Sequence, residues 1–164
     1  MLRKSRIYLD TSVISFLYAD DAPDKRIATV EFFRDFINPG VYETYISDFV
    51  VAEIENTRDL KRKQKMLDVI NEYSINFLEL DNQNELDELA AKYVNAGIIP
   101  EKKLLDAYHI AVAVTNEINI LVSWNYKHLA NLNRERRINI VNLANNYGDK
   151  LRIVTPLELM DYEN

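Results

Sequence analysis

The chain has 164 residues, a length that fits one domain with a sizeable hydrophobic core. Its net charge of −6 argues against a general duplex-binding surface, which would be basic, and the absence of cysteine excludes disulfides, zinc–thiolate sites and cysteine nucleophiles. Three glycines are too few for the common phosphate-binding loops, which excludes P-loop, kinase-like and dinucleotide-binding proteins. The sequence contains no apolar run long enough to cross a bilayer, and we expect a cytoplasmic protein.

The first predicted strand, residues 7–9, is a short run of strand formers that suits a strand buried on both faces. It ends at Asp10, and Thr11 or Ser12 can cap the helix that follows to residue 18. Asp10 therefore lies at the carboxyl end of a strand, which is the edge where open α/β sheets bind ligands. One interpretation is an acid that complements the helix dipole. The other is a functional carboxylate, which requires further carboxylates at the same edge.

Predicted helices and strands alternate along the rest of the chain. The further helices span residues 25–37, 48–56, 58–73, 82–96, 103–117, 126–129, 134–147 and 156–160, and the further strands span residues 42–47, 75–80, 120–123 and 153–155. This alternation is typical of a parallel sheet covered by helices on both sides. We expect residues 1–164 to form one α/β domain, a three-layer α/β/α sandwich with a mainly parallel central sheet of four to five strands.

Glu53 follows four apolar residues, 49–52, and precedes Ile54 within a predicted helix. A charged side chain in so apolar a segment is rarely buried unless it is paired or bound to a metal. The alternative is a solvated stripe that Glu53 shares with Glu55, Asn56 and Asp59.

Asp106 and His109 interrupt a helix that is apolar on nearly every other side. They are three residues apart and so lie on one helical face, and aspartate is a poor residue in the middle of a helix. One interpretation is a hydrogen-bonded Asp–His pair within the core. The other is a functional carboxylate, Asp106, with His109 as its supporting partner rather than a general base.

Asn125 follows the strand over residues 120–123, and it joins Asp10 if the two strands are parallel. It can also cap the short helix over residues 126–129. Acids at strand ends and on helices, without cysteine, suit a hard cation such as Mg²⁺ or Mn²⁺. Such an ion can activate a water and stabilise the oxygens of a phosphoryl displacement.

Five segments resemble, in order, the motifs of the PIN domain, the ribonuclease fold of VapC-type toxins in bacterial toxin–antitoxin pairs. They are YLDTSVI at residues 8–14, SDFVVAEI at residues 47–54, LDAYHIA at residues 105–111, LVSWN at residues 121–125 and IVTPLEL at residues 153–159. The resemblance extends over essentially the whole chain.

The resemblance implies hydrolysis of RNA phosphodiester bonds with Mg²⁺ or Mn²⁺ as cofactor. Asp10, Glu53 and Asp106 would be the metal ligands, with support from Thr11 or Ser12. It also implies a small antitoxin protein as partner, and a homodimer. Candidate contacts with that partner or with RNA are Phe16, Tyr18 and the basic segment 58–65. The basic segment is alternatively a solvated face.

Asn125 departs from the family pattern, because many members have aspartate at this position. An amide oxygen can ligate a metal or orient a metal-bound water, but it brings no charge, so we expect weaker occupancy of any second metal. We keep Asn125 among the catalytic residues. The alternative is a PIN-like binding module without turnover, which Asn125 and the acidic composition favour. A nuclease acting on structured DNA is a third possibility.

Overall fold

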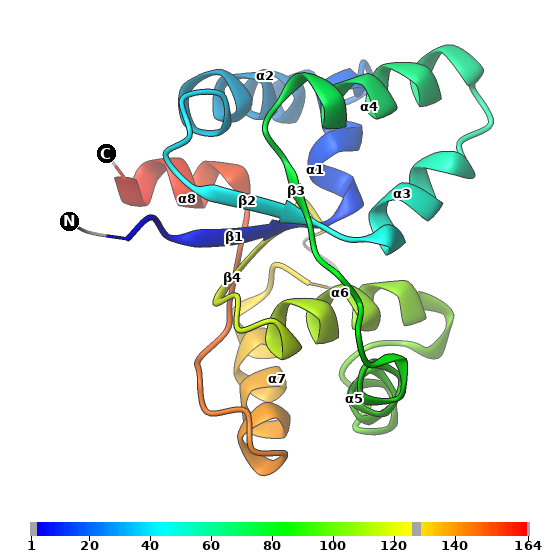
Figure 1. The fold of residues 1–164 in the computed structure, drawn as a ribbon, viewed down its shortest axis with the longest axis vertical. Helices are drawn as coiled ribbons and strands as arrows, with labels where there is room; N and C mark the ends of the chain where they lie inside the picture. Colours follow the sequence, from blue (N-terminus) through cyan, green and yellow to red (C-terminus); the bar gives the residue numbers. More distant parts are fainter. Residues whose placement is uncertain (1–2, 126–128, 164) are drawn as a thin grey trace.

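The computed structural model describes residues 3–125 and 129–163, so most of the short helix predicted over residues 126–129 lies outside the described residues. Five strands form the sheet, in the order β3-β2-β1-β4-β5, and every pairing is parallel (Figure 1). The strands are β1 (Arg6–Leu9), β2 (Glu43–Ile46), β3 (Asn76–Phe77), β4 (Ile120–Val122) and β5 (Arg152–Val154). The predicted parallel sheet is confirmed.

Helices cover both faces of this sheet (Figure 1). One layer contains α1 (Thr11–Ser15), α2 (Pro23–Phe32), α3 (Asp48–Glu55), α4 (Leu60–Glu72) and α8 (Pro156–Glu163). The other layer contains α5 (Gln83–Asn95), α6 (Leu104–Thr115) and α7 (Leu132–Ala144). The predicted α/β/α sandwich is therefore confirmed.

Capping side chains set several boundaries that the helical periodicity alone places differently. Asp59 accepts hydrogen bonds from the backbone N–H groups of Lys61 and Arg62, so α4 begins two residues later than predicted. Asn131 caps α7 in the same way, so that helix begins two residues earlier than predicted.

Two predicted elements are interrupted or shortened. The helix predicted to continue to Ile37 widens into a π-helical turn over Phe33–Ile37, in which Asn38 N–H donates to Phe33 O at 2.8 Å. The third strand is only Asn76–Phe77 instead of residues 75–80, because it is the outer strand β3, where Phe77 is 51% exposed.

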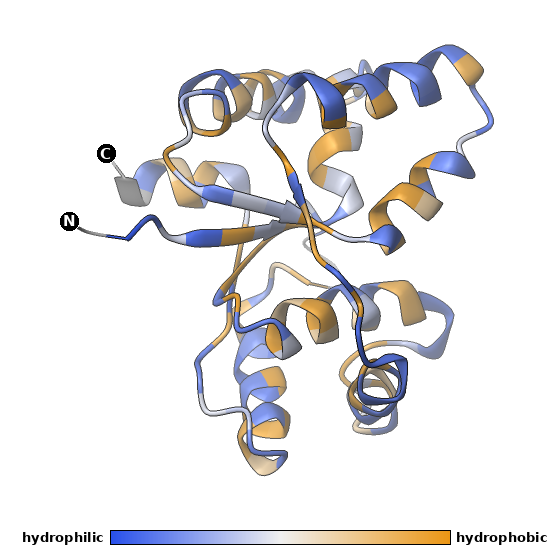
Figure 2. Cartoon of the chain, in the orientation of Figure 1, coloured by the Kyte–Doolittle hydropathy of each residue, from blue (hydrophilic) through white to orange (hydrophobic). Residues whose placement is uncertain are grey.

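The hydrophobic core lies between the sheet and the two helical layers. Ile7, Tyr8 and Leu9 of β1 are fully buried, and α6 is buried along most of its length. Hydrophobic residues on most helices face the sheet, with hydrophilic ones outward (Figure 2). Among the described residues, none of the helices has both the length and the apolar character needed to span a membrane.

The pairing of β1 with β4 determines where the candidate site lies. Leu9 pairs with Val122, so the next residues, Asp10 and Ser123, lie side by side at the carboxyl ends of the two strands. The strand order reverses at β1, since β2 and β3 extend to one side of it and β4 and β5 to the other. Ligands of open α/β sheets bind at such a point.

The β4 side of this junction gives a test of the core. Leu121→Ala removes a fully buried side chain of β4, so we expect the free energy of unfolding to fall by about 2–5 kcal/mol. Leu132→Ala, at a position that is 73% exposed, should change it by less than about 0.5 kcal/mol. Urea unfolding measures both variants, and equal losses would contradict this packing.

Candidate active site

Asp10 is held at the β1–β4 junction by three hydrogen bonds, although its side chain is only 3% exposed. Its Oδ1 accepts from Ser12 N–H at 3.0 Å and from Ser12 Oγ at 2.5 Å, and its Oδ2 accepts from Ser123 Oγ at 2.5 Å. Burial raises the pKa of Asp10, against the opposing effects of His109 and these hydroxyls. Asp10 therefore caps α1, as the first interpretation expects, and it also presents a carboxylate at the sheet edge, as the functional interpretation requires.

The loop after β4 is tied to the same carboxylate. Ser12 Oγ accepts from Trp124 N–H, and Ser123 Oγ accepts from Asn125 N–H, each at 2.9 Å. No local sequence pattern singles out Ser123. Only the register of β1 and β4 places Ser123 beside Asp10, and one sequence by itself does not reveal that register.

Glu53 extends from α3 toward this edge, with a side chain that is 30% exposed. Its Oε1 accepts from Thr11 Oγ1 at 2.7 Å and lies 2.5 Å from His109 Nε2. Burial acts to raise the pKa of Glu53, but the hydrogen bond and charge of His109 outweigh it, so the pKa is lowered. Glu55 instead pairs with Lys63 at 3.1 Å, so the two glutamates do not share one solvated stripe.

His109 has a different partner from the predicted one. Its Nε2 contacts Glu53, and its Nδ1 lies 2.7 Å from the hydroxyl of Tyr8, which in turn lies 2.7 Å from Ser47 Oγ. The predicted hydrogen-bonded pair of Asp106 and His109 is therefore wrong. The two residues share a face of α6, but His109 is one turn deeper and reaches β1 and α3. Burial acts to lower the pKa of His109, but Glu53 outweighs it, so the pKa is raised.

Asp106, in the first turn of α6, faces the loop after β4 instead. Its Oδ2 accepts from Asn125 Nδ2 at 3.0 Å, so Asn125 does join the edge that holds Asp10. Burial raises the pKa of Asp106 to about 6, and the charge of Asp10 adds to this effect. His109 acts in the opposite direction, Glu53 again raises the pKa, and Lys103 lowers it.

The charges and free oxygens of these acids fit a hard cation. The negative charges of Asp10 and Glu53 both act on Asp106, and within the described residues no hydrogen bond reaches Glu53 Oε2 or Asp106 Oδ1. Carboxylate oxygens are the ligands that Mg²⁺ and Mn²⁺ prefer. In the part of the chain that the structure describes, however, no three His, Asp or Glu side chains are grouped closely enough to hold a metal ion.

Comparison with known proteins identifies the family. The sequence model of the PIN domain matches residues 7–146. The chain belongs to the PIN domain family. PIN domains are generally nucleases that hydrolyse phosphodiester bonds, and they generally use divalent metals.

A solved structure has the same fold. It is the crystal structure of VapBC2 from Rickettsia felis bound to a DNA fragment from their promoter, with a TM-score of 0.55 and 16% sequence identity. The match covers 92% of this PIN-domain chain and 98% of the VapBC2 chain. No curated protein sequence matches the chain significantly.

The raised pKa of Asp106 predicts how stability depends on pH. The ordinary pKa of an aspartate is 3.8, and that of Asp106 in the folded state is about 6. Between these two pH values the folded state binds more protons than the unfolded state, so the free energy of unfolding falls as pH rises. Without metal, Asp106→Asn should therefore be more stable than wild type at pH 7.5, by about 1–2 kcal/mol after allowing for its partial exposure. The difference should shrink toward zero at pH 4.

Urea unfolding in EDTA at the two pH values measures this difference. Asp81→Asn, which alters an exposed acid before α5, is the matched control and should leave the pH dependence unchanged. An Asp106→Asn variant that is less stable than wild type by the same amount at both pH values would contradict this. It would show that burial and neighbouring charges do not destabilise the ionised carboxylate of Asp106.

Proposed function

We propose that this PIN domain is an endoribonuclease that hydrolyses RNA phosphodiester bonds with Mg²⁺ or Mn²⁺. The observation that carries the proposal is that hydrogen bonds of Thr11, Ser123 and Asn125 place Glu53, Asp10 and Asp106 around the carboxyl ends of β1 and β4. The cation would have to draw the three carboxylates closer together than they lie in the described residues. Membership of a family whose members are generally nucleases supports it. Acids with a purely structural role would be expected to pair with basic side chains. Among the described residues, His109 is the one buried basic partner of these acids.

The three acids would hold the cation, with Glu53 and Asp106 offering the oxygens that accept no hydrogen bond from described residues. When bound, a divalent cation lowers the pKa of a water and stabilises the oxygens of a phosphoryl displacement. The protein's contribution is to fix the ligands. Ser12 and Ser123 immobilise both oxygens of Asp10, and Thr11 and His109 hold one oxygen of Glu53.

Asn125 acts on Asp106 in this proposal. Its amide donates to Asp106 Oδ2, so it would hold that oxygen and leave the other one for a cation without adding a negative charge. The alternative function, a PIN-like module that binds RNA or protein without turnover, has the same residue in its favour, because a neutral Asn125 leaves the edge with fewer acidic ligands.

The substrate would approach along the start of α6. Lys102 and Lys103 are exposed there, and Lys103 is close enough to Asp106 to act on its pKa, against the larger effect of burial. These lysines would meet RNA phosphates beside an otherwise acidic site. No group described above reads a 2′-hydroxyl, so the choice of RNA over DNA rests on the VapC resemblance.

We also propose that the chain is the toxin of a type II pair, neutralised by a small antitoxin protein in the cytoplasm. The supporting observations are the fold of VapBC2 and a groove of about 340 Å³ between the turn after α1, α2 and α4. The groove is lined by apolar and aromatic side chains, among them Leu17, Tyr18, Val30, Phe33, Val69 and Tyr73. Tyr18 is one of the predicted contacts. The homodimer implied by the family resemblance remains a prediction.

Cleavage of a mixed RNA pool with Mn²⁺, Mg²⁺ or EDTA tests the proposed activity. Wild type should cleave with either metal and not with EDTA. Asp106→Asn should cleave at least ~100-fold more slowly with either metal, because it lacks one of the proposed metal-binding carboxylates. Because the same substitution is expected to stabilise the metal-free fold, its loss of activity would not reflect unfolding. Asp81→Asn, purified in parallel, should cleave as wild type does.

Two outcomes would contradict the proposal. Equal cleavage by wild type and Asp106→Asn would assign the activity to a contaminant or to another site. Absence of cleavage by wild type with either metal, on both structured and single-stranded RNA, would favour the binding module.

A further inference from the structure

Two stacked aromatic side chains lie at the rim of the candidate site. Phe49 is in the first turn of α3 and Tyr108 is in α6, and their ring centroids are 4.8 Å apart with an angle of 24° between the planes. Both side chains are partly exposed. The pair therefore joins the two helices that carry Glu53 and Asp106.

The aromatic pair is adjacent to the site carboxylates. Phe49 precedes Glu53 by four residues and so lies on the same side of α3. Its ring stands edge-on to the imidazole of His109, at 6.5 Å and 76°, and that imidazole holds Glu53 Oε1. Tyr108 is two residues beyond Asp106 and so lies on another side of α6, which means that the pair reaches the site through Phe49 and His109. The imidazole of His109 is therefore the one ring between the aromatic pair and Glu53.

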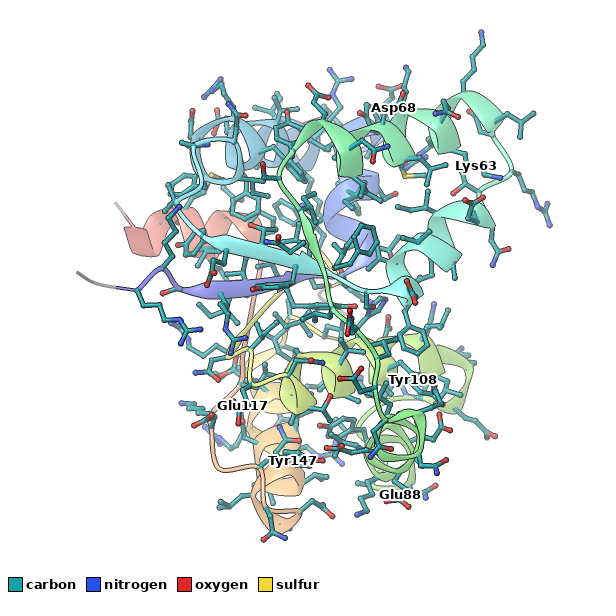
Figure 3. All side chains as sticks on the ribbon, in the orientation of Figure 1. Lys63, Asp68, Glu88, Tyr108, Glu117 and Tyr147 are labelled. Atoms are coloured by element: carbon teal, nitrogen blue, oxygen red, sulfur yellow. The ribbon has the colours of Figure 1, made fainter. Side chains whose placement is uncertain are left out.

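Tyr108 is also anchored from a third helix. Its hydroxyl donates to Asp87 Oδ1 of α5 at 2.5 Å, and Gln83 donates to the same oxygen at 2.8 Å. The label in Figure 3 places Tyr108 between α6 and α5. Packing of α3 on α6 requires apolar contact, but it does not require a partly exposed ring fixed in place through a surface carboxylate. A ring held in this way can bind a flat ligand with little further loss of side-chain entropy.

We propose that Phe49 and Tyr108 form a stacking platform for one unpaired base of the RNA whose phosphate lies at the acidic edge. Aromatic side chains stack on any base, so the platform would accept different sequences. It would favour single-stranded RNA, because bases within a duplex are already stacked and paired. The inference rests on the proposed nuclease function and adds to it how a nucleotide is positioned next to the scissile phosphate.

Binding of single-stranded RNA in EDTA tests the platform without cleavage. The probes are two fluorescein-labelled 12-nucleotide RNAs, one with all its bases and one that is abasic at every position. Fluorescence anisotropy should show the wild-type protein binding the abasic probe about tenfold more weakly, which is the order expected for one lost stacking contact. The wild-type comparison does not depend on the folding of any variant.

Variants then assign the effect to the two rings. Phe49→Leu and Tyr108→Leu keep apolar bulk but remove the stacking face, so each should weaken binding of the intact RNA about tenfold and leave binding of the abasic RNA unchanged. Tyr108→Phe keeps the ring and loses only the bond to Asp87, so it should retain most of the preference. Circular dichroism and thermal unfolding confirm that each variant is folded.

Tyr147→Leu is the matched control. The hydroxyl of Tyr147 likewise donates to a carboxylate oxygen, that of Glu85, at 2.5 Å. Tyr147 and Glu117 line one cavity beyond the carboxyl end of α6, whereas Asp106 is in its first turn, and this helix is about 18 Å long. Figure 3 shows Tyr108 and Tyr147 at separate places in the lower helical layer. This variant should bind both probes as wild type does.

Several outcomes would overturn the platform, and they differ from those that would overturn the nuclease. Equal binding of both probes by wild type, or absence of binding to either, would refute the platform while cleavage could still occur. A change of oligomeric state in Phe49→Leu or Tyr108→Leu, without loss of base preference, would make the pair a protein interface. Base-dependent binding without cleavage would keep the platform and refute the nuclease.

Discussion

The burial of Asp10 between β1 and β4 is the constraint on which the rest of the site depends. A carboxylate with 3% exposure is costly unless it is hydrogen-bonded, and here Ser12 and Ser123 donate to both of its oxygens. Ser123 is available only because β4 pairs with β1 in parallel and in register. The bonds from Trp124 and Asn125 to these serines then fix the loop that brings Asn125 to Asp106. The register of β1 and β4 therefore determines the geometry of the site.

The charges of the site are compensated unequally. Glu53 has the buried His109 beside it and a lowered pKa, whereas Asp106 has a neutral amide partner and a pKa raised to about 6. One buried and two partly buried acids with one basic partner leave a net negative charge in a region where water screens it poorly. A bound divalent cation would remove that excess, which connects the stability of the fold to the chemistry we propose for it.

The sequence predicts the parts of this arrangement that depend on local pattern. Alternating elements predict the parallel sandwich. The strand–Asp10–helix junction and the acids within apolar helices indicate Asp10, Glu53 and Asp106 as candidate site residues. Helical spacing places Asp106 and His109 on one face, but it does not say which neighbouring element each side chain meets, so the partner of His109 is predicted incorrectly. Ser123 and Tyr8 act through contacts between strands and helices distant in sequence, and no local pattern marks them. The short β3 and the π-helical turn also depend on tertiary packing.

The central claim is that Asp10, Glu53 and Asp106 together bind a divalent cation. The most direct test is an anomalous difference map from crystals of the wild-type protein grown with Mn²⁺. We predict a peak in contact with all three carboxylates, and its absence from crystals of Asp106→Asn grown in the same way. A well-ordered edge without a peak, or a peak bound elsewhere on the protein, would contradict the account.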